Sequence, residues 1–485
     1  MTTARAAAAS ALDRLALPLV LLLALALRLR EALSVPLWFD ELYTRAAADR
    51  PWADMLRVMR ADVHPPLHFV LSWAWRVFGD SDLAVRSLSI ACGLGALALG
   101  WVLARALFGR AVAHATALLL ALHPWHLYLS QEARSYPLLW LTLGLSAVGA
   151  WRWCERETRG RATLFVAGSA LALWTHYLAA LVLALQWLWG LARLRREPLR
   201  MARWTLLHVA VAAAFAPLLP LILAQTARVG GEHLMAHFTL ADLIDVVRRV
   251  AFGSLKLLLP VAALAAWAFR ERAARRAATF ALVMGPGSVL VCFAFGLWQQ
   301  GLFAPKYAML ALAPTMALVA SGALRLPGRV APALALVALA VIEVRGIALR
   351  PHYPEAASLG ATRAYLAPRI QPGDVVFSGD SHTYLFGRRY FPRARQRLLL
   401  MGQRLPYYEG RAAIPDSAFG DAAELRAAAA SGARWFALSW GRGGVHGDAL
   451  AALCDSLTAP PAHCELVRVW SGAAIANTSA GAPAR

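Results

Sequence analysis

The feature that most constrains this chain is a series of long apolar runs. Each contains about 18 to 23 residues, enough for a helix to cross a hydrocarbon core of roughly 30 Å. Inside such a core every backbone amide must be hydrogen-bonded within its own segment, so the runs are expected to be helices. We count about 11 of them between residues 15 and 348. The sequence therefore predicts a polytopic α-helical membrane protein.

The composition agrees with a membrane protein and excludes one soluble class. Hydrophobic residues make up 59% of the chain and charged residues 16%, whereas soluble proteins average about 45–50% and about 25%. The formal net charge is +21, which on a soluble protein would indicate nucleic-acid binding. Here the arginines lie mainly in short loops between apolar runs, as the positive-inside rule describes. We therefore predict membrane lipids, and no nucleic acid, as partners.

Arginine-rich loops also predict the orientation of the chain in a bacterial inner membrane. They fall on one side when the runs are threaded in order, and that side is predicted to be cytoplasmic. The loops are 152–161, 193–203 and 270–276. Residues 1–349 then form a membrane domain whose long first loop, residues 34–83, is periplasmic.

The tail, residues 350–485, has the composition of a soluble domain, and the odd number of spans places it outside as well. Residues 374–378 and 434–440 are typical of buried strands, and residues 422–431 and 448–457 are typical of helices. Alternating strands and helices predict a small extracytoplasmic α/β domain.

Two cysteines of the tail, Cys454 and Cys464, are ten positions apart. In an extracytoplasmic domain they can form a disulfide. No cysteine pair has the spacing of a metal finger.

An acidic pair, Asp40-Glu41, stands in the first outer loop directly after Leu37-Trp38-Phe39. Neighbouring residues on a helix point about 100° apart, so the two cannot serve one atom in the same way. One carboxylate would act as a general base while the other orients a partner or a ligand. The structural alternative is that Asp40 is a helix N-cap and Glu41 favours the helix dipole.

Further polar residues fall on the same predicted face. Arg134 can grip a phosphate through its planar guanidinium, and Lys306 can bind a phosphate or extend to the interface. Glu132 can orient Arg134 or, with His64, bind a metal ion; the alternatives are a salt bridge and a helix cap. The substrate-binding candidates are His64, Glu132, Arg134, Tyr136, His176, Tyr177, Lys306 and Tyr307.

Together these side chains fit glycosyl transfer from a lipid phosphate. The leaving group is already a phosphate, so cations that neutralise its charge are needed more than a strong acid. The acceptor hydroxyl needs a carboxylate base, which contributes on the order of 10²–10⁴ in rate.

The chain also resembles a known family, glycosyltransferase family 39 and its bacterial relatives. These include protein O-mannosyltransferases, lipid A aminoarabinose transferases and galacturonosyltransferases of the lipopolysaccharide core. The likeness covers about residues 35–180. The matching segments are LWFDE, HPPLHFVL, RSLS, ALHPWHLYLSQEARSYPLL and THY.

The resemblance implies a GT-C fold, a polyprenyl-phosphate sugar donor and an inverting displacement. It places the family's acidic motif on Asp40 and Glu41, with Asp40 as general base. A late basic residue that is often arginine in the family is Lys306 here. Some relatives use a divalent metal and others none, so the metal stays open, with Glu132 and His64 as candidates.

Two other functions stay open at this stage. One is a transporter of a polyprenyl-linked sugar or a lipid, although transporters usually place polar groups near the midplane. The other is an assembly protein whose tail binds an anionic glycan through an arginine segment. That segment contains Arg388, Arg389, Arg393, Arg395 and Arg397. The sugar and the acceptor, which can be an envelope glycan, a lipid or a protein, are not predicted.

Overall fold

The chain divides into two compact units. The helical unit comprises Met1–Leu33 and Val63–Arg350, and the sheet unit comprises Ser34–Asp62 and Pro351–Arg485. A computed structural model describes residues 2–229, 239–250, 254–298, 305–349, 354–401, 405, 410–440, 447–458, 461–464 and 467–472.

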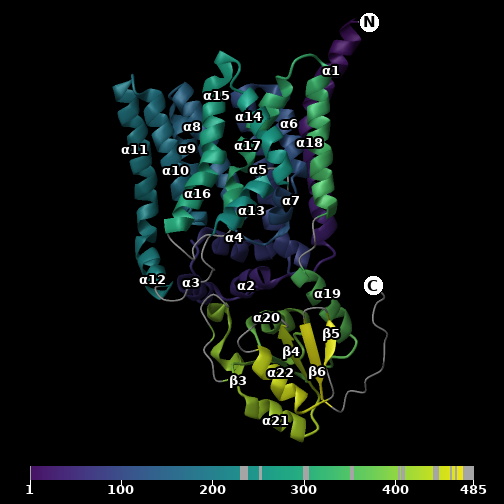
Figure 1. Ribbon diagram of the computed structural model, residues 1–485. Coiled ribbons are helices and arrows are strands. Elements are labelled where there is room, and N and C mark those ends of the chain that lie inside the picture. The colour runs from purple at the N-terminus through teal and green to yellow at the C-terminus, as the bar shows by residue number, and fades with distance from the viewer. Residues whose placement is uncertain are drawn as a thin grey trace. The chain divides into compact units, whose positions relative to one another are not determined.

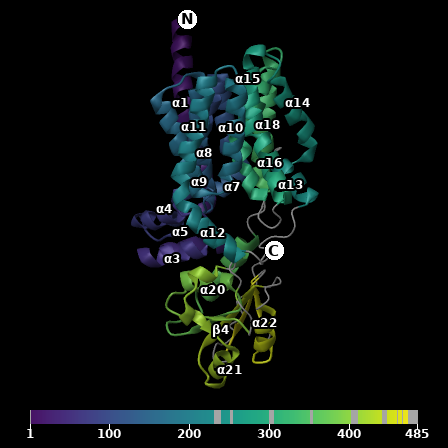
Figure 2. The same cartoon turned by 90° about the vertical axis from the view of Figure 1, so that its left-hand side faces the viewer.

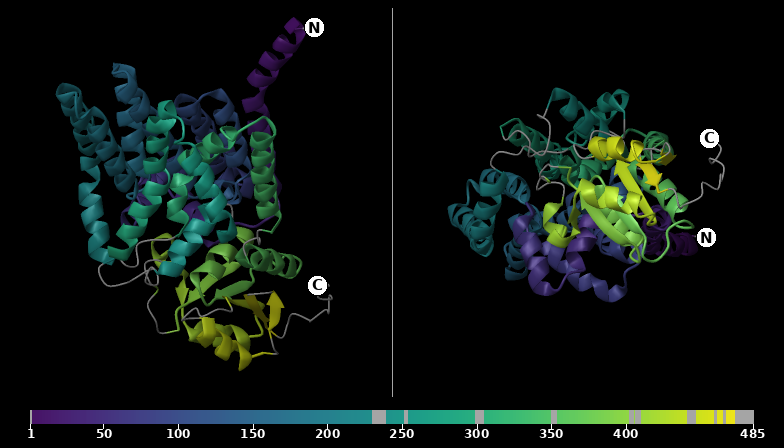
Figure 3. Two further views of the ribbon diagram at one scale, coloured as in Figure 1. Left: turned by 45° about the horizontal axis from the view of Figure 1, so that its top comes forward. Right: turned by 90° about the horizontal axis from the view of Figure 1, so that it is seen from below.

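The helical unit is a bundle of helices that run side by side (Figures 1 and 3). Its described elements are α1 (Thr2–Ala32), α4 (Leu67–Trp75), η1 (Arg76–Phe78), α5 (Asp82–Phe108), α6 (Arg110–Leu122), α7 (Pro124–Gln131), α8 (Tyr136–Glu155), α9 (Arg159–Thr175), α10 (Ala179–Leu194), α11 (Pro198–Phe215), η2 (Ala216–Leu218), α12 (Leu219–Val229), α13 (Leu240–Val250), η3 (Leu255–Leu257), α14 (Leu258–Trp267), η4 (Arg272–Ala274), α15 (Arg275–Met284), α16 (Pro286–Trp298), η5 (Pro305–Ala311), α17 (Leu312–Leu324) and α18 (Val330–Leu349).

Within the described residues, every predicted apolar run overlaps one or more of these helices. Several runs are broken, for example at Pro124 between α6 and α7 and at Pro286 between α15 and α16, because proline cannot donate a helical hydrogen bond. Within the described residues, four helices are long and apolar enough to cross a membrane, or five if the bent pair α13–α14 is one span. The four are Asp82–Phe108, Pro198–Ala227, Arg272–Trp298 and Val330–Ala348. The chain is thus a multi-pass membrane protein, and the number of about 11 spans stays a prediction.

Small residues allow a close helix crossing between α8 and α9. A Cβ atom on Gly149 would lie 2.6 Å from the backbone nitrogen of Phe165. A Cβ atom on Gly168 would in turn lie 2.6 Å from the backbone nitrogen of Ser146. Backbone approaches this close require glycine on both helices.

Gly149→Ala is therefore expected to destabilise the bundle by about 1–3 kcal/mol, the usual cost of overpacking a core. Gly160→Ala in α9 is the matched control, because a Cβ atom there meets nothing within 4 Å. The measurement is the thermal unfolding midpoint of the purified protein in detergent. Equal midpoints for the two variants would show that the crossing tolerates a methyl group.

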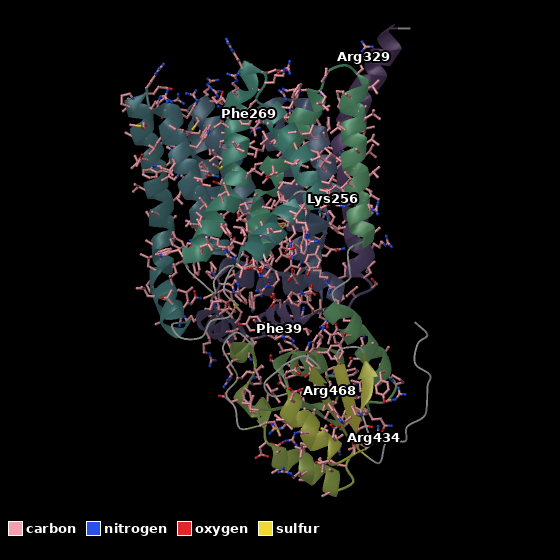
Figure 4. The ribbon with its side chains drawn as sticks, viewed as in Figure 1. Phe39, Lys256, Phe269, Arg329, Arg434 and Arg468 are labelled. Atoms are coloured by element: carbon pink, nitrogen blue, oxygen red, sulfur yellow. The ribbon has the colours of Figure 1, made fainter. Side chains whose placement is uncertain are left out.

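One end of the bundle gathers the arginine-rich loops. Arg203 donates to Glu157 at 3.0 Å, Arg325 donates to Glu271 at 3.1 Å, and Arg276 pairs with Glu155. These ion pairs join the segments at α8–α9, α11, η4–α15 and the end of α17, and Figure 4 shows Arg329 at the same end. The predicted arginine loops therefore do share one face of the helical unit.

The sheet unit contains a six-stranded mixed sheet in the order β3-β2-β1-β4-β6-β5. The strands are β1 (Val375–Ser378), β2 (Arg395–Leu399), β3 (Phe419–Gly420), β4 (Trp435–Trp440), β5 (Ala462–Cys464) and β6 (Val467–Ser471). The helices are α2 (Phe39–Ala48), α3 (Trp52–Ala61), α19 (Pro354–Leu366), α20 (Ser381–Tyr390), α21 (Ala422–Ala430) and α22 (Gly447–Asp455), with short turns η7 (Arg411–Ala413) and η8 (Asp416–Ala418).

The two central strands are parallel and buried, as their apolar sequences predict. Val375 of β1 pairs with Arg395 of β2 on one side and with Trp435 of β4 on the other. Helix α22 packs on β4, which Figure 2 shows from the side. The expected small α/β domain is confirmed, including its strands near 374–378 and 434–440.

The first loop does not lie in one unit. Its first half, which carries α2 and α3, belongs to the sheet unit, whereas the sequence placed all of 34–83 with the membrane domain. Helix α2 packs on α20, the backbone N–H of Leu37 donates to the Tyr390 hydroxyl at 2.7 Å, and Arg50 donates to the Ala413 carbonyl at 2.7 Å. An amphipathic helix must bury its apolar face, and α2 does so against the tail.

The predicted disulfide between Cys454 and Cys464 falls partly outside the described residues. Cys454 is a free, fully buried thiol in the core beneath the sheet, where burial raises its pKa to about 12. Cys464 is in β5, and its side chain lies outside the described residues. The Cys454–Cys464 disulfide therefore stays a prediction.

Candidate active site

The polar residues of the helical unit meet at the end of the bundle opposite the arginine loops. Helix α8 begins at Tyr136, among these residues, and ends at Glu155, whose side chain is part of the arginine end. A helix of 20 residues is about 30 Å long, so the two ends are separated by the thickness of a bilayer core.

The segment between α7 and α8 is short and tightly held. After Gln131 the chain leaves the helix, the N–H of Arg134 donates to the Glu132 carbonyl at 2.7 Å, and α8 begins at Tyr136. The hydroxyl of Ser89 in α5 donates to the Arg134 carbonyl at 3.2 Å. The Glu132 side chain is 3% exposed and Arg134 is 9% exposed, so both charges are placed in a largely dry environment.

A second group surrounds His176, in the turn between α9 and α10. Its ring centroid is 6.2 Å from that of His64 and 5.0 Å from that of Tyr307. The hydroxyl of Tyr177 donates to Gln225 at 2.7 Å, and the Gln225 amide donates to the His64 carbonyl at 3.3 Å. Helix α12 thereby connects the His64 turn with the α9–α10 turn.

Lys306 and Tyr307 complete the group from η5. The Lys306 ammonium lies 5.1 Å from the centre of the Tyr136 ring, which is within the range of a cation–π contact. The rings of Tyr136 and Tyr307 are 6.0 Å apart. His64, Arg134 and Lys306 all lie within electrostatic reach of His176.

We call His64, Arg134, Tyr136, His176, Lys306 and Tyr307 the basic–aromatic cluster. It unites side chains from four chain segments, all of which the sequence had selected, at one end of the helical unit. Two permanent cations and two imidazoles in a largely buried place are an arrangement that can bind an anion, and the rings offer flat faces on which a sugar or lipid can pack.

The sequence did not reveal the support beneath this cluster. Arg28 of α1 is fully buried and bonds the Nδ1 atom of His126 in α7 at 2.7 Å, while the His126 ring stacks on Trp140 at 4.7 Å. The amide of Gln131 donates to the Arg28 carbonyl at 2.8 Å. These bonds fix α7, from which Glu132 and Arg134 follow. Arg28 and His126 interrupt apolar runs, which was the available signal.

The acidic pair lies in the sheet unit. Glu41 is 1% exposed and its carboxylate accepts the backbone N–H of Trp38 at 3.2 Å, so it caps the start of α2. Trp38 is the N-cap residue, so Asp40 stands inside the first turn rather than at the cap, and it is half-buried. Phe39, labelled in Figure 4, contacts the ring of His382 at 4.0 Å.

Glu132 and His64 were the candidate metal ligands, and the described residues offer no third ligand beside them. Among the residues that the structure describes, no group of three or more His, Cys, Asp or Glu side chains can hold a metal ion.

An apolar cavity of about 610 Å³ lies between α13, α14, α15, α16 and α17. It is lined by side chains such as Val247, Val261, Leu318 and Phe269, the last of which Figure 4 labels. Helix α13, which lines the cavity, packs against η5, which carries Lys306 of the basic–aromatic cluster.

Known proteins resemble this chain in family and fold. The family model for dolichyl-phosphate-mannose-protein mannosyltransferases matches residues 63–223. Among solved structures, ArnT from Cupriavidus metallidurans bound to undecaprenyl phosphate has a TM-score of 0.64 at 15% identity, covering 95% of this chain and 99% of that chain. The apo form of the same protein also has a TM-score of 0.64 at 15% identity, over 96% and 99% of the two chains.

A weaker likeness is to the oligosaccharyltransferase of Archaeoglobus fulgidus, with a TM-score of 0.44 at 13% identity over 79% of this chain and 64% of that chain. No curated protein sequence matches. The likeness to ArnT establishes the fold of the chain, and the family model covers the segments that form most of the basic–aromatic cluster.

Proposed function

We propose that the chain is a membrane glycosyltransferase of the GT-C type that moves a sugar from a polyprenyl-phosphate donor to an acceptor, because residues 63–223 match the mannosyltransferase family model and the fold is that of ArnT. The observation that carries this proposal is the basic–aromatic cluster, which has the charge needed for a phosphate leaving group. The predicted family resemblance is confirmed, and the donor, acceptor and residue roles are what we propose.

The apolar cavity supports a lipid-linked donor. An isoprenoid chain is purely apolar, and the cavity is lined almost wholly by aliphatic side chains of the helical unit. Its neighbour η5 presents Lys306, so a lipid tail in the cavity and its phosphate near Lys306 would be joined over a short path. The ArnT relative was solved with undecaprenyl phosphate, which agrees with this class of donor.

The proposed reaction is a single inverting displacement. The acceptor hydroxyl oxygen forms a bond to the anomeric carbon while the bond from that carbon to the phosphate oxygen breaks. Asp40 takes the hydroxyl proton as general base, and the polyprenyl phosphate leaves as an anion held by Arg134 and Lys306. Glu41, whose carboxylate caps α2, positions Asp40 on that helix.

The proposed location is the bacterial inner membrane with the reaction on its outer face. The arginine end of the helical unit would face the cytoplasm by the positive-inside rule. The basic–aromatic cluster, at the opposite end, would then face the periplasm, where the acceptor is an envelope glycan, a lipid or a protein.

The test is transfer by the purified full-length protein. Polyprenyl-phosphate sugars are supplied with envelope extracts from cells that lack the chain, and mass spectrometry compares the glycans, lipids and proteins with and without enzyme. A new sugar on one acceptor, with release of polyprenyl phosphate, supports the proposal. Movement of labelled donor across vesicles without any product would identify a transporter instead.

Lys306 provides a prediction on donor binding. Lys306→Met is expected to raise the donor KM and to lower kcat/KM about 10- to 100-fold, because one cation near the phosphate is lost. Lys306→Arg keeps the charge and should retain most of the activity. Lys256→Met removes the only other lysine of the chain, in η3, and is the matched control. Steady-state kinetics with varied donor make the comparison, and equal losses in both methionine variants would remove Lys306 from the site.

A further inference from the structure

The arginines of the tail differ in their ion-pair and hydrogen-bond partners. Arg397 forms an ion pair with Glu424 and bonds the Ser417 carbonyl, while Arg434 donates to Asp374 at 2.9 Å. Two further ion pairs follow the same pattern, that of Arg411 with Asp416 and that of Arg468 with Asp448. Most arginines in folded proteins are satisfied in this way, so an exception is informative.

Arg388, in the described part of the sheet unit, is a case in which a buried guanidinium donor lacks an acceptor. It stands in the last turn of α20, is half-buried, and its Nη1 atom is buried without a hydrogen-bond partner. A cation at a helix C-terminus gains from the helix dipole, and this is the structural alternative. The dipole does not satisfy a buried N–H donor, however, and leaving such a donor without an acceptor is costly.

A second arginine approaches Arg388 from the other part of the unit. Arg50 precedes α3, and its side chain is anchored by the hydrogen bond to the Ala413 carbonyl. The pKa of Arg50 is lowered by burial and, next, by the charge of Arg388. Both guanidinium groups also act on the buried phenol of Tyr384. Burial raises the pKa of this phenol, and the two positive charges partly oppose that rise.

Two guanidinium groups that repel each other in a partly buried place create a strong local positive potential. Tyr43 lies within electrostatic reach of Arg50, so the same place also contains two phenols, those of Tyr43 and Tyr384. A phenol can donate a hydrogen bond to an anion but supplies no fixed negative charge. The chemistry that this arrangement satisfies is a small oxyanion with several acceptor oxygens.

We propose that Arg50 and Arg388, with Tyr384, form a phosphate-binding site in the sheet unit, separate from the basic–aromatic cluster. A phosphate offers three or four oxygens to two planar forks and a phenol, whereas a single carboxylate has only two. The phosphate can belong to a lipid headgroup or be free in solution. The site consists of groups within one unit and does not depend on the proposed transferase activity.

The experiment measures binding to the full-length protein in a non-ionic detergent, without donor sugar. The probes are inorganic phosphate and dihexanoyl phosphatidic acid, with sodium chloride at equal ionic strength and dihexanoyl phosphatidylcholine as their controls. The readout is the thermal unfolding midpoint, which rises with the concentration of any ligand that binds only the folded state. The variants are Arg388→Gln, Arg388→Lys and, as matched control, Arg395→Gln at the exposed start of β2.

We expect a saturable rise in the wild type and in R395Q, and at least a tenfold higher half-saturating concentration in R388Q. R388K keeps the charge without the fork, so its loss should be smaller; it also serves if R388Q does not fold. A response only to the phosphatidic acid assigns the site to lipid headgroups, and a response only to inorganic phosphate assigns it to soluble phosphate. Absence of a saturable response to both probes, or the same response in R388Q and R395Q, overturns the proposal.

Discussion

Replacing Asp40 with asparagine is expected to abolish sugar transfer while the protein still folds and inserts. The amide has nearly the shape of the carboxylate but cannot accept a proton at neutral pH. Loss of general-base catalysis costs about 10²–10⁴ in rate, so kcat of the variant should fall by that factor. Donor binding should change little, because the phosphate would be held by the cations Arg134 and Lys306 and not by Asp40.

The matched control is Asp49→Asn at the C-cap of the same helix. Asp49 is exposed and pairs with Arg45 at 2.7 Å, and exposed ion pairs contribute about 0–1 kcal/mol. This variant removes the same charge from α2, so it tests whether charge alone matters. Glu41→Gln is informative too, because its side-chain carbonyl can still accept the N–H of Trp38 and should preserve the cap.

The measurement is product formation at saturating donor and acceptor over a range of pH. In the wild type the rate should fall on the acidic side as the base becomes protonated, and in D40N this acidic limb should disappear from the residual rate. Full activity of D40N would remove Asp40 as the base. A D49N variant as inactive as D40N would point instead to a structural role for the charge of α2.

Local patterns predicted much of the fold because their causes are local. Apolar runs marked the helices, and β-branched and aromatic residues marked β1 and β4, since burial and periodicity are visible in a single segment. The position of α2 was not predictable in that way. The bond from Leu37 to Tyr390 joins residues 353 positions apart, and no local pattern records such a contact.

The candidate site shows the same division. Four substrate-binding candidates could be selected from the sequence because each interrupts an apolar or turn segment near a predicted membrane face. They are His64, Arg134, His176 and Lys306. The residues that hold these side chains in place could not be selected, because the sequence position of a buried polar residue does not reveal its partner. Arg28 and His126 are 98 positions apart, and only the packing of α1 against α7 brings them together.

Replacing Arg134 with alanine is expected to produce the second large loss of activity. Arg134 is 9% exposed, and its backbone is fixed on both sides by the bonds to Glu132 and Ser89. A cation held in a dry site acts most strongly on charge that develops during the reaction, and removing one such group typically costs about 10²–10³ in kcat. We therefore expect kcat/KM of R134A to fall by at least that factor.

A lysine at this position separates charge from geometry. Arg134→Lys keeps one positive charge but loses the planar fork that binds two phosphate oxygens, so its activity should lie between those of R134A and the wild type. Arg159→Ala, at the exposed start of α9 among the arginine loops, is the matched control and should be fully active. Because Arg134 is buried, unfolding midpoints are measured beside the kinetics. A folded R134A variant with wild-type kcat/KM for the polyprenyl-phosphate donor would show that the basic–aromatic cluster does not hold the leaving phosphate.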